Sequence, residues 1–328
     1  MTSQLTTGSI NVYNLSVLVT GGAGFIGSHI VETLIGLGAK RVRIMDSLAT
    51  GKMSNIQPFL DAHPNTVEFM YGDIANLDAC RKATEGMDVV THQAALGSVP
   101  RSVEDPLSSH ITNVNGFLNI LIAARDCGIK RVVYASSSSV YGSDVILPKV
   151  EENVGEVLSP YAATKAIDEI YAGVFVKCYG MECIGMRYFN IFGPRQDPNG
   201  AYAAVIPKFI EQMKSGAAPT IHGDGSFSRD FTYVSNAVRA NLLGLTTTNA
   251  ECFGQAFNIG AGGQTCLTTL VAVINSELKT NIRPIFGPPR PGDIPHSNAD
   301  ISKAGAMLGY EPVEQFLSGM TKVVDTFR

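Results

Sequence analysis

The segment "SPYAATKA", residues 159–166, carries the side chains that point most directly to chemistry. Ser159 is a good helix N-cap and Pro160 suits a first turn, so a helix is expected to begin just before Tyr161. The i, i+4 spacing then places Tyr161 and Lys165 on one face of that helix. A nearby ammonium and a positive helix N-terminus stabilise a phenolate, which would accept a proton from an alcohol. The ordinary alternative is a pair of side chains on a solvated helix face.

A serine run, "ASSSSVYG", follows an expected strand that precedes this helix. Ser137 stands four residues before Tyr141 and is our candidate to hydrogen-bond the reacting oxygen, with Ser138 as a second candidate. The run lies where a doubly wound sheet binds its ligands, at the carboxyl end of a strand. Because serine runs are usually turns or caps, this assignment depends on the neighbouring Tyr-Lys helix.

Three glycines, Gly21, Gly24 and Gly27, follow the first expected strand in G-x-x-G-x-x-G spacing. Such glycines let backbone N–H groups approach a pyrophosphate at a helix N-terminus. Asp46 ends the second strand, where a carboxylate would accept hydrogen bonds from ribose hydroxyls and repel a 2′-phosphate. The pattern predicts NAD, and favours it over NADP. Asp73 ends the third strand and could contact adenine, although a helix N-cap explains it nearly as well.

The chain alternates short apolar runs with longer helical patterns, which indicates a parallel sheet covered by helices on both faces. Strands are expected at 15–20, 41–46, 67–73, 88–95, 131–138 and 182–190, and helices at 25–37, 76–85, 107–127 and 160–179. The predicted fold class is therefore α/β, a Rossmann-type doubly wound sheet with a smaller C-terminal α/β substrate-binding region. The expected division is 1–190 for the NAD-binding domain, with a return at about 227–262, and 191–328 for the substrate region.

The composition of the chain argues against several other classes of function. The formal net charge is −4 and no basic run is present, which argues against nucleic-acid binding. No apolar stretch reaches the roughly 18 residues of a membrane span. The N-terminal residues resemble no signal peptide, and the six cysteines form no C-x-x-C motif. We therefore expect a cytoplasmic protein with buried, reduced thiols and no metal site.

Several stretches together resemble the extended short-chain dehydrogenase/reductases, and among them the nucleotide-sugar epimerases. The resemblance covers residues 15–328 and rests on "TGGAGFIGSH", "HQAALGSVPRS", "NVNGFLNILIAARD", "SSSSVYG", "SPYAATK", "RYFNIFGPRQDPNGAYAAVIP", "GDGSFSRDFTYV" and "RPGDIPHSNADISKA". Within that family, "QAALGSVPRS" and "RQDPNGAYAAVIP" are most similar to the bacterial UDP-N-acetylglucosamine 4-epimerases. The resemblance implies that Tyr161 takes the proton of the sugar O4 while the C4 hydride passes to tightly held NAD. The 4-keto sugar then turns about its diphosphate and receives the hydride on its other face.

The resemblance also assigns roles by position. The catalytic set is Ser137, Tyr161 and Lys165, and Lys165 would also bind the nicotinamide ribose. The implied cofactor site comprises Gly21, Gly24, Phe25, Ile26, Gly27, Asp46, Ser47, Asp73, Ile74, Gln93, Ala94, Ala95, Asn113, Tyr161, Lys165 and Tyr188. The implied substrate site comprises Ser98, Ser137, Ser138, Tyr161, Asn190, Ala204, Val205, Arg229, Arg290, Asp293 and Ser297. Of these, Asn190, Arg229, Arg290 and Asp293 would hold the nucleotide diphosphate and uridine, for which guanidinium groups are well suited.

Departures from the family pattern narrow the reaction. Similar dehydratases carry an Asp-Glu pair where this chain has Ser138 and Ser139, and related decarboxylases keep a glutamate there. Epimerisation is therefore favoured over elimination or decarboxylation. Ser297 stands where a bulky tyrosine restricts relatives to unsubstituted hexoses, so it favours UDP-GlcNAc and UDP-GalNAc, with UDP-glucose and UDP-galactose as slower substrates. The alternatives are a loop serine without this role, a UDP-N-acetylglucosaminuronate epimerase, a non-catalytic NAD-binding regulatory protein and a net dehydrogenase.

The resemblance further implies a homodimer. The helices at 107–127 and 160–179 pair across a two-fold axis in the family, which gives a four-helix interface. Apolar residues beyond the needs of one core face, such as Ile120, Ile167, Ile170 and Val174, are consistent with it. Burial of each within the monomer is the alternative.

Overall fold

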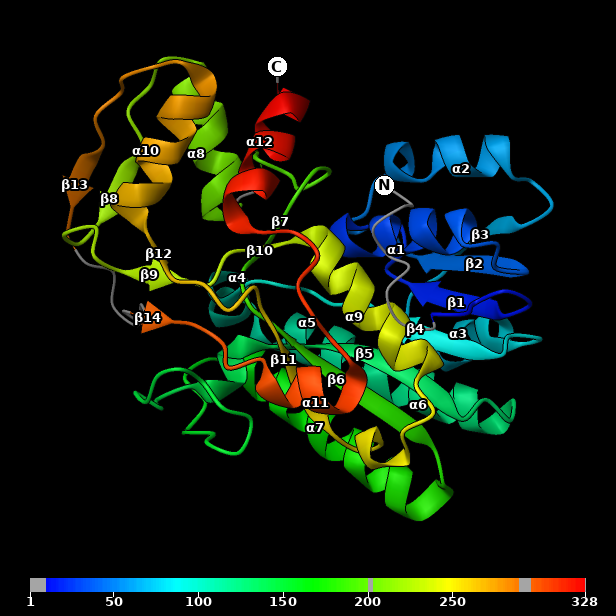
Figure 1. The fold of residues 1–328 in the computed structure, drawn as a ribbon. Coiled ribbons are helices and arrows are strands. Elements are labelled where there is room, and N and C mark those ends of the chain that lie inside the picture. The colour runs from blue at the N-terminus through cyan, green and yellow to red at the C-terminus, as the bar shows by residue number, and fades with distance from the viewer. Residues whose placement is uncertain (1–9, 200–202, 289–295, 328) are drawn as a thin grey trace.

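The computed structural model describes residues 10–199, 203–288 and 296–327. Its centre is one parallel sheet of seven strands in the order β11-β6-β5-β4-β1-β2-β3 (Figure 1). The strands are β1 Ser16–Thr20, β2 Arg41–Asp46, β3 Val67–Tyr71, β4 Val89–His92, β5 Arg131–Ser137, β6 Glu182–Tyr188 and β11 Ala256–Ile259. All six strands expected from the sequence are present. The central strands β1, β4 and β5 are mostly buried on both faces, whereas the edge strand β3 is only partly buried and ends at the exposed Tyr71. The sheet therefore needs a layer of helices on each side.

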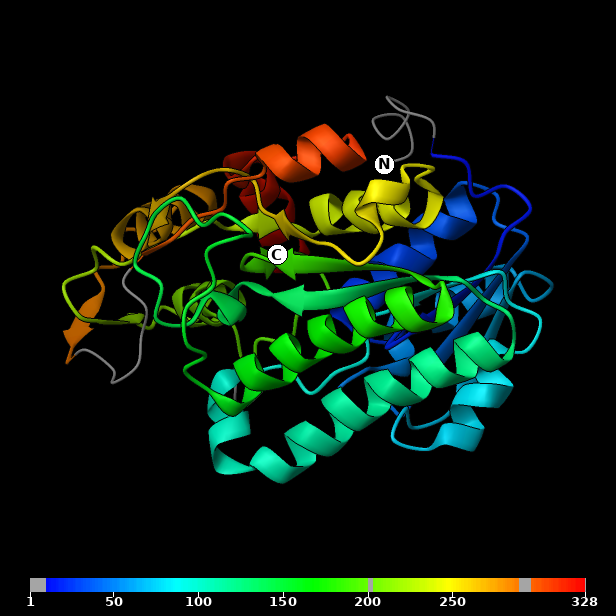
Figure 2. The ribbon, with the colours of Figure 1, turned by 90° about the horizontal axis from the view of Figure 1, so that it is seen from below.

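Two helical layers cover the sheet. One face carries α1 (Phe25–Gly36) and α9 (Val234–Thr246), and α11 (Ser302–Leu308) packs beside β11. The other face carries α3 (Leu77–Thr84), α6 (Gly116–Asp126) and α7 (Pro160–Tyr179). Figure 2 shows α6 and α7 side by side across that second face. Successive residues of β1 serve the two layers, since Val17 and Val19 join the core under α1 while Leu18 joins the core under α6.

The helix expected at 107–127 consists of three parts. The structure has α5 (Pro106–His110), a π-helical turn (Ile111–Asn115) and α6 in direct succession. A π-helical turn changes which residues face the sheet, and such turns are frequent at functional sites. Two short helices, α2 (Gln57–Ala62) and α4 (Val99–Glu104), were not predicted. Three 3₁₀ turns cover 53–55, 138–141 and 250–252.

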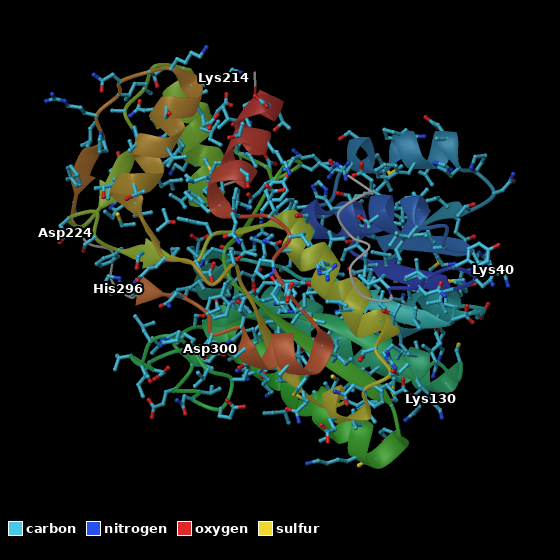
Figure 3. The ribbon with its side chains drawn as sticks, viewed as in Figure 1. Lys40, Lys130, Lys214, Asp224, His296 and Asp300 are labelled. Carbon is cyan, nitrogen blue, oxygen red and sulfur yellow. The ribbon has the colours of Figure 1, made fainter. Side chains whose placement is uncertain are left out.

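A smaller region with its own apolar core lies beyond the carboxyl ends of the strands (Figure 1). Its helices are α8 (Val205–Lys214), α10 (Leu267–Leu278) and α12 (Phe316–Phe327). Its strands form three small sheets: β7 (Ile191–Phe192) with β10 (Thr232–Tyr233), β8 (Thr220–His222) with β13 (Ile285–Gly287), and β12 (Thr265–Cys266), β9 (Ser228–Arg229) and β14 (His296–Ser297) in the order β12-β9-β14. Figure 3 shows His296 at the outer edge of this region, near Asp224 and across the molecule from Lys40.

The chain passes between the two regions more than once. After β6 it enters the smaller region, returns to the sheet as α9 and β11, and leaves again through β12 and α10. In β11, Ala256 to Ile259 pair in parallel with Gly185 to Tyr188 of β6. Of the stretch 227–262, α9 and β11 belong to the main sheet and its helical layer, whereas β9 and β10 belong to the small sheets, so the expected division of the chain stays a prediction.

The six cysteines are free thiols, but only part of the prediction of burial is correct. Cys80, Cys183 and Cys252 are buried, whereas Cys127 and Cys178 are exposed at helix ends. Within the described residues, no helix is both long and apolar enough to cross a membrane.

Candidate active site

A cavity of about 430 Å³ lies at the carboxyl ends of β1, β2, β4, β5 and β6. It brings together most of the residues predicted for the site. Of the predicted set, its lining includes Gly21, Gly24, Phe25, Ile26, Gly27, Asp46, Ser47, Asp73, Ile74, Gln93, Ala94, Ala95, Ser137, Tyr161, Lys165, Tyr188 and Asn190. Residues that sequence reasoning missed also line it, among them Thr50, Leu96, Thr112, Ser136 and Gln196.

The glycine loop forms one end of this cavity. The N–H of Gly21 donates to the carbonyl of Met45 at 2.8 Å, and the N–H of Gly24 donates to the carbonyl of Gly21 at 3.0 Å. Gly21 has a φ of +66°, which favours glycine. A Cβ on Gly27 would lie 2.2 Å from the oxygen of Gly21, so only glycine fits there. The loop therefore packs tightly against the start of α1. Because its glycines have no side chains, a pyrophosphate could approach the backbone at the N-terminus of this helix.

Asp46 connects the end of β2 to this loop. Its Oδ2 accepts a hydrogen bond from the N–H of Ala23 at 3.0 Å, and its Oδ1 accepts one from the N–H of Leu48 at 2.8 Å. Burial raises the pKa of Asp46, and these two backbone donors partly offset that rise. Each carboxylate oxygen retains a second lone pair that could accept from a ribose hydroxyl, so the predicted contact of Asp46 with the ribose stays a prediction.

Asp73 is exposed at the cavity, beyond the end of β3. Its Oδ1 accepts a hydrogen bond from the N–H of Ala75 at 2.9 Å. The N-cap of α3 is Asn76, whose Oδ1 accepts from the N–H of Ala79 at 3.0 Å. The alternative interpretation of Asp73 as the helix cap is therefore wrong, and the prediction of an adenine contact remains.

The start of α7 places the predicted catalytic side chains. Ser159 caps the helix by accepting from the N–H of Ala162 at 3.1 Å, as the sequence predicts. The N–H of Tyr161 donates to Oγ of Ser102 at 2.9 Å, which fixes this turn of α7 against α4. Ser102 is fully buried, and sequence reasoning did not identify it. The start of α7, which carries the predicted catalytic side chains, is thus anchored at both its cap and its first turn.

Ser137 ends β5, and its Oγ accepts from the N–H of Ser139 at 3.1 Å. It shares the cavity wall with Tyr161 and Lys165. Lys165 is buried, and its Nζ donates to the carbonyl of Ala135 at 3.0 Å and to Oδ2 of Asp168 at 3.1 Å. Burial alone would lower the pKa of Lys165, but the negative charge of Asp168 and the oxygen of Tyr161 outweigh it, and the net pKa is raised. The raised pKa keeps the Lys165 amine protonated at neutral pH.

Two predicted cofactor residues form a polar network in the wall. The hydroxyl of Tyr188 donates to Oε1 of Gln93 at 2.9 Å and accepts from Nδ2 of Asn241 at 2.6 Å. The Nε2 of Gln93 donates to Oδ1 of Asn241 at 2.9 Å. Burial raises the pKa of Tyr188, so its hydroxyl stays protonated and keeps these bonds. The network holds Gln93 and Tyr188 at the cavity through Asn241 of α9, a partner that the sequence motifs do not reveal.

Asn113 lies behind the wall of the cavity. Its Oδ1 accepts from the N–H of Leu96 at 2.8 Å, and its Nδ2 donates to the carbonyl of Leu96 and to Oγ1 of Thr164. It is 1% exposed and belongs to the π-helical turn. Asn113 therefore fixes the loop after β4 against α7, which shapes the site from outside the cavity.

The structure brings only some of the predicted substrate residues to the cavity. Asn190 lies on the cavity with a φ of +37°, and its carbonyl accepts from the N–H of Thr232 at 3.2 Å. Arg229 and Ser297 lie in the smaller region as direct partners in the parallel pairing of β9 and β14. Arg290 and Asp293 lie outside the described residues. The remaining predicted residues, Ser98, Ser138, Ala204 and Val205, do not line the cavity itself.

Known proteins resemble this chain over nearly its whole length. Residues 17–260 match the model of the NAD dependent epimerase/dehydratase family. The UDP-glucose 4-epimerase of Mycolicibacterium smegmatis is 35% identical over 316 residues, which covers 96% of this chain and 99% of that protein. The structure of the UDP-N-acetylglucosamine 4-epimerase of Methanobrevibacter ruminantium, in complex with UDP-N-acetylmuramic acid, matches with a TM-score of 0.89 and 39% identity, covering 96% and 98% of the two chains.

A third relative was solved with its cofactor. The UDP-glucuronic acid 4-epimerase of Bacillus cereus, in complex with UDP-glucuronic acid and NAD, matches with a TM-score of 0.87 and 32% identity, covering 95% of this chain and 98% of that one. The family model, the related sequences and the related structures agree on one family. The chain therefore belongs to the NAD-dependent epimerase/dehydratase family, and NAD is its cofactor.

Proposed function

We propose that this chain is a UDP-sugar 4-epimerase that interconverts UDP-N-acetylglucosamine and UDP-N-acetylgalactosamine. The observation that carries this proposal is that Ser137, Tyr161 and Lys165 line one cavity. The strand order places β4 and β1 between Ser137, at the end of β5, and Asp46, at the end of β2. A proton acceptor, a hydrogen-bond donor and a cation at one wall suit the oxidation of a secondary alcohol.

The roles of the three side chains follow from their chemistry. The phenolate of Tyr161, stabilised by the buried cation of Lys165, takes the proton from the O4 hydroxyl of the sugar. The hydroxyl of Ser137 hydrogen-bonds the same oxygen. Bound NAD supplies the acceptor for the C4 hydride and the donor that returns it. Once the 4-keto sugar presents its other face, Tyr161 returns the proton to O4, so the reaction has no net change in oxidation state.

The segment after β5 supports epimerisation over elimination. Residues 138–141 form a 3₁₀ turn directly behind Ser137, and Ser138 and Ser139 occupy the positions where similar dehydratases carry acids. Without a carboxyl group in this turn, no side chain there exchanges a proton at C5 or C6. The keto sugar therefore keeps its C5 proton and is reduced again.

The sugar class is proposed from Ser297 and from the charge of the cavity. In β14, Ser297 is the register partner of Arg229, so the two side chains lie on the same face of the small sheet. A small residue beside an arginine that would bind the diphosphate leaves room for a 2-acetamido group. Among the described residues that line the cavity, Lys165 is the basic one, and it is already paired with Asp168. This favours a neutral sugar over a uronate.

The direct test incubates the purified protein with UDP-GlcNAc, without added cofactor, and follows UDP-GalNAc by NMR. We expect many turnovers per chain, because the hydride returns to the same sugar. Absence of a C4-epimeric product would contradict the proposal, and product from UDP-N-acetylglucosaminuronate alone would select that acid as the substrate.

Ser297→Tyr is expected to separate the two classes of neutral sugar. The phenol ring would fill the space for the acetamido group, so kcat/KM for UDP-GlcNAc should fall about a hundredfold, whereas the value for UDP-glucose should change less than about fivefold. Ser297→Ala keeps the space and should keep both activities. Equal losses on both sugars in Ser297→Tyr would show that position 297 does not select the sugar.

We also propose a homodimer formed through α5 and α7. Leu107 is 67% exposed and Ile170 is 66% exposed, and α5 packs against α7, so these apolar side chains belong to neighbouring helices on one layer. Val174 is also exposed on α7, whereas Ile120 lies fully inside the core and does not belong to an interface. Unpartnered apolar residues of this size on adjacent helices are typical of an association surface.

Sedimentation velocity should report a mass near twice that of one chain. Ile170→Glu should weaken the dimer at least about tenfold, since it buries a charge in an apolar contact. Leu317→Glu is the control, because Leu317 is similarly exposed, at 63%, on α12. A monomeric wild-type protein, or equal effects of the two variants, would contradict this interface.

A further inference from the structure

A buried ion pair on α7 joins Lys165, one of the proposed catalytic residues, to Asp168. The Nζ of Lys165 is 3.1 Å from Oδ2 of Asp168, and the two side chains are 2% and 1% exposed. Their i, i+3 spacing places them on the same face of the helix. The ammonium also donates to the carbonyl of Ala135 in β5. Two of its three N–H donors are therefore held by the protein, which leaves one for the cavity.

The buried carboxylate of Asp168 lowers the stability of the fold at this position. Its second oxygen, Oδ1, is buried and has no hydrogen-bond partner within the described part of the chain. Burial raises the pKa of Asp168 to about 6, even though Lys165 acts in the opposite direction. A half-satisfied buried carboxylate costs free energy that an apolar residue would avoid. Such a cost beside a reacting group indicates a role in the site.

The adjacent acid, Glu169, has a different task. It holds Arg187 of β6 through two hydrogen bonds of 2.9 and 2.8 Å, and it accepts from the hydroxyl of Ser136 at 2.6 Å. Glu169 is therefore neutralised by its own partner and does not replace Asp168 as the counterion of Lys165.

We propose that Asp168 is a positioning residue for the reaction: its carboxylate fixes the Lys165 ammonium at the cavity wall and tempers the positive charge that Tyr161 experiences. The proposal rests on the proposed function, in which Lys165 stabilises the Tyr161 phenolate. The other titratable groups that act on this pair are Glu169 on α7, Tyr134 on β5 and His92 on β4.

Because His92 and Tyr134 are neutral, the charge of Asp168 is the one that offsets Lys165 near Tyr161. Burial, and next the charge of Lys165, lower the pKa of His92 to about 3, so its ring is neutral. Burial raises the pKa of Tyr134 well above its usual value, so it is neutral too. Removing the negative charge at position 168 should therefore strengthen the positive potential at Tyr161. A stronger positive potential favours the charged phenolate over the neutral phenol.

Asp168→Asn removes the charge but keeps an oxygen that accepts from Lys165, whereas Asp168→Ala removes both. In Asp168→Asn we expect the acidic limb of the kcat profile to move down by about one pH unit, with plateau kcat within about threefold. In Asp168→Ala we expect plateau kcat to fall at least about tenfold with little change in KM, because the ammonium is no longer held. Asp78→Asn, an exposed position on α3, controls for net charge and should shift nothing.

A second measurement does not depend on turnover. The pH titration of tyrosinate absorbance, taken as the difference between each protein and its Tyr161→Phe counterpart, should show the same downward shift in Asp168→Asn. An unchanged midpoint and an unchanged acidic limb would overturn the proposal even if the alanine variant failed to fold. A wild-type protein without epimerase activity would instead overturn the proposed function. The absorbance titration would still show whether the charge of Asp168 affects the ionisation of Tyr161.

Discussion

Tyr161→Phe is expected to lower kcat for epimerisation about a thousandfold, the range that a positioned acid–base group contributes. Phenylalanine keeps the ring but has no oxygen to take the O4 proton, and no other described tyrosine except Tyr188 lines the cavity. Tyr188 cannot substitute, because burial raises its pKa and its hydroxyl is committed to Gln93. The measurement is the initial rate of UDP-GalNAc formation by NMR, together with the NAD content of the purified variant.

Retention of NAD and of the melting temperature distinguishes a catalytic role from a structural one. Tyr171→Phe is the matched control, since Tyr171 lies on the same helix and outside the cavity lining. It should leave kcat within about twofold. A Tyr161→Phe protein that keeps near-normal kcat, or one that loses its fold, would refute the role assigned to Tyr161.

Gly27→Ala is expected to have the largest effect on the cofactor. Its new Cβ would lie 2.2 Å from the oxygen of Gly21 and 2.8 Å from the Cα of Gly22, both of which are backbone atoms. The loop must therefore move away from α1, which misplaces the N–H groups that would bind the pyrophosphate. We expect NAD affinity to fall about a hundredfold, equivalent to roughly 3 kcal/mol, and the free energy of unfolding to fall by about 2 kcal/mol.

Isothermal titration with NAD and urea unfolding of the apoprotein measure the two effects separately. Gly305→Ala is the control, because Gly305 lies in α11 and its new Cβ would meet only an ordinary contact of 3.5 Å. That variant should bind NAD normally and gain up to about 1 kcal/mol from helix propensity. Normal NAD affinity in Gly27→Ala would mean that the glycine loop does not approach the cofactor.

The parts of the fold that the sequence predicted are those with local causes. Continuous apolar runs located the six strands, and Ser159 with Pro160 located the first turn of α7, because these signals act over a few residues. The glycine loop and Asp46 were predicted for the same reason. Position at a strand end is a local property, and the carboxyl ends of parallel strands converge on one edge.

The remaining parts depend on contacts between distant residues. Ser102 binds the backbone of Tyr161 across 59 positions, and Asn241 reaches Gln93 across 148. The π-helical turn places Asn113 behind the wall, although a regular helix was expected there. No local pattern encodes such pairings. The adjacency of Arg229 and Ser297 likewise depends on two-residue strands, which are too short to leave a periodic signal.

The position of β11 has a consequence for how this protein can be divided. Because α9 and β11 complete the sheet only after the chain has visited the smaller region, no single cut separates the two. A fragment ending after β6 would lack α9, which packs beside α1 on the sheet, and β11, which borders β6, and would present an open sheet edge. We therefore expect the two regions to fold as one unit, because the backbone connects them at least twice. Any movement of one region relative to the other must bend the chain at these connections.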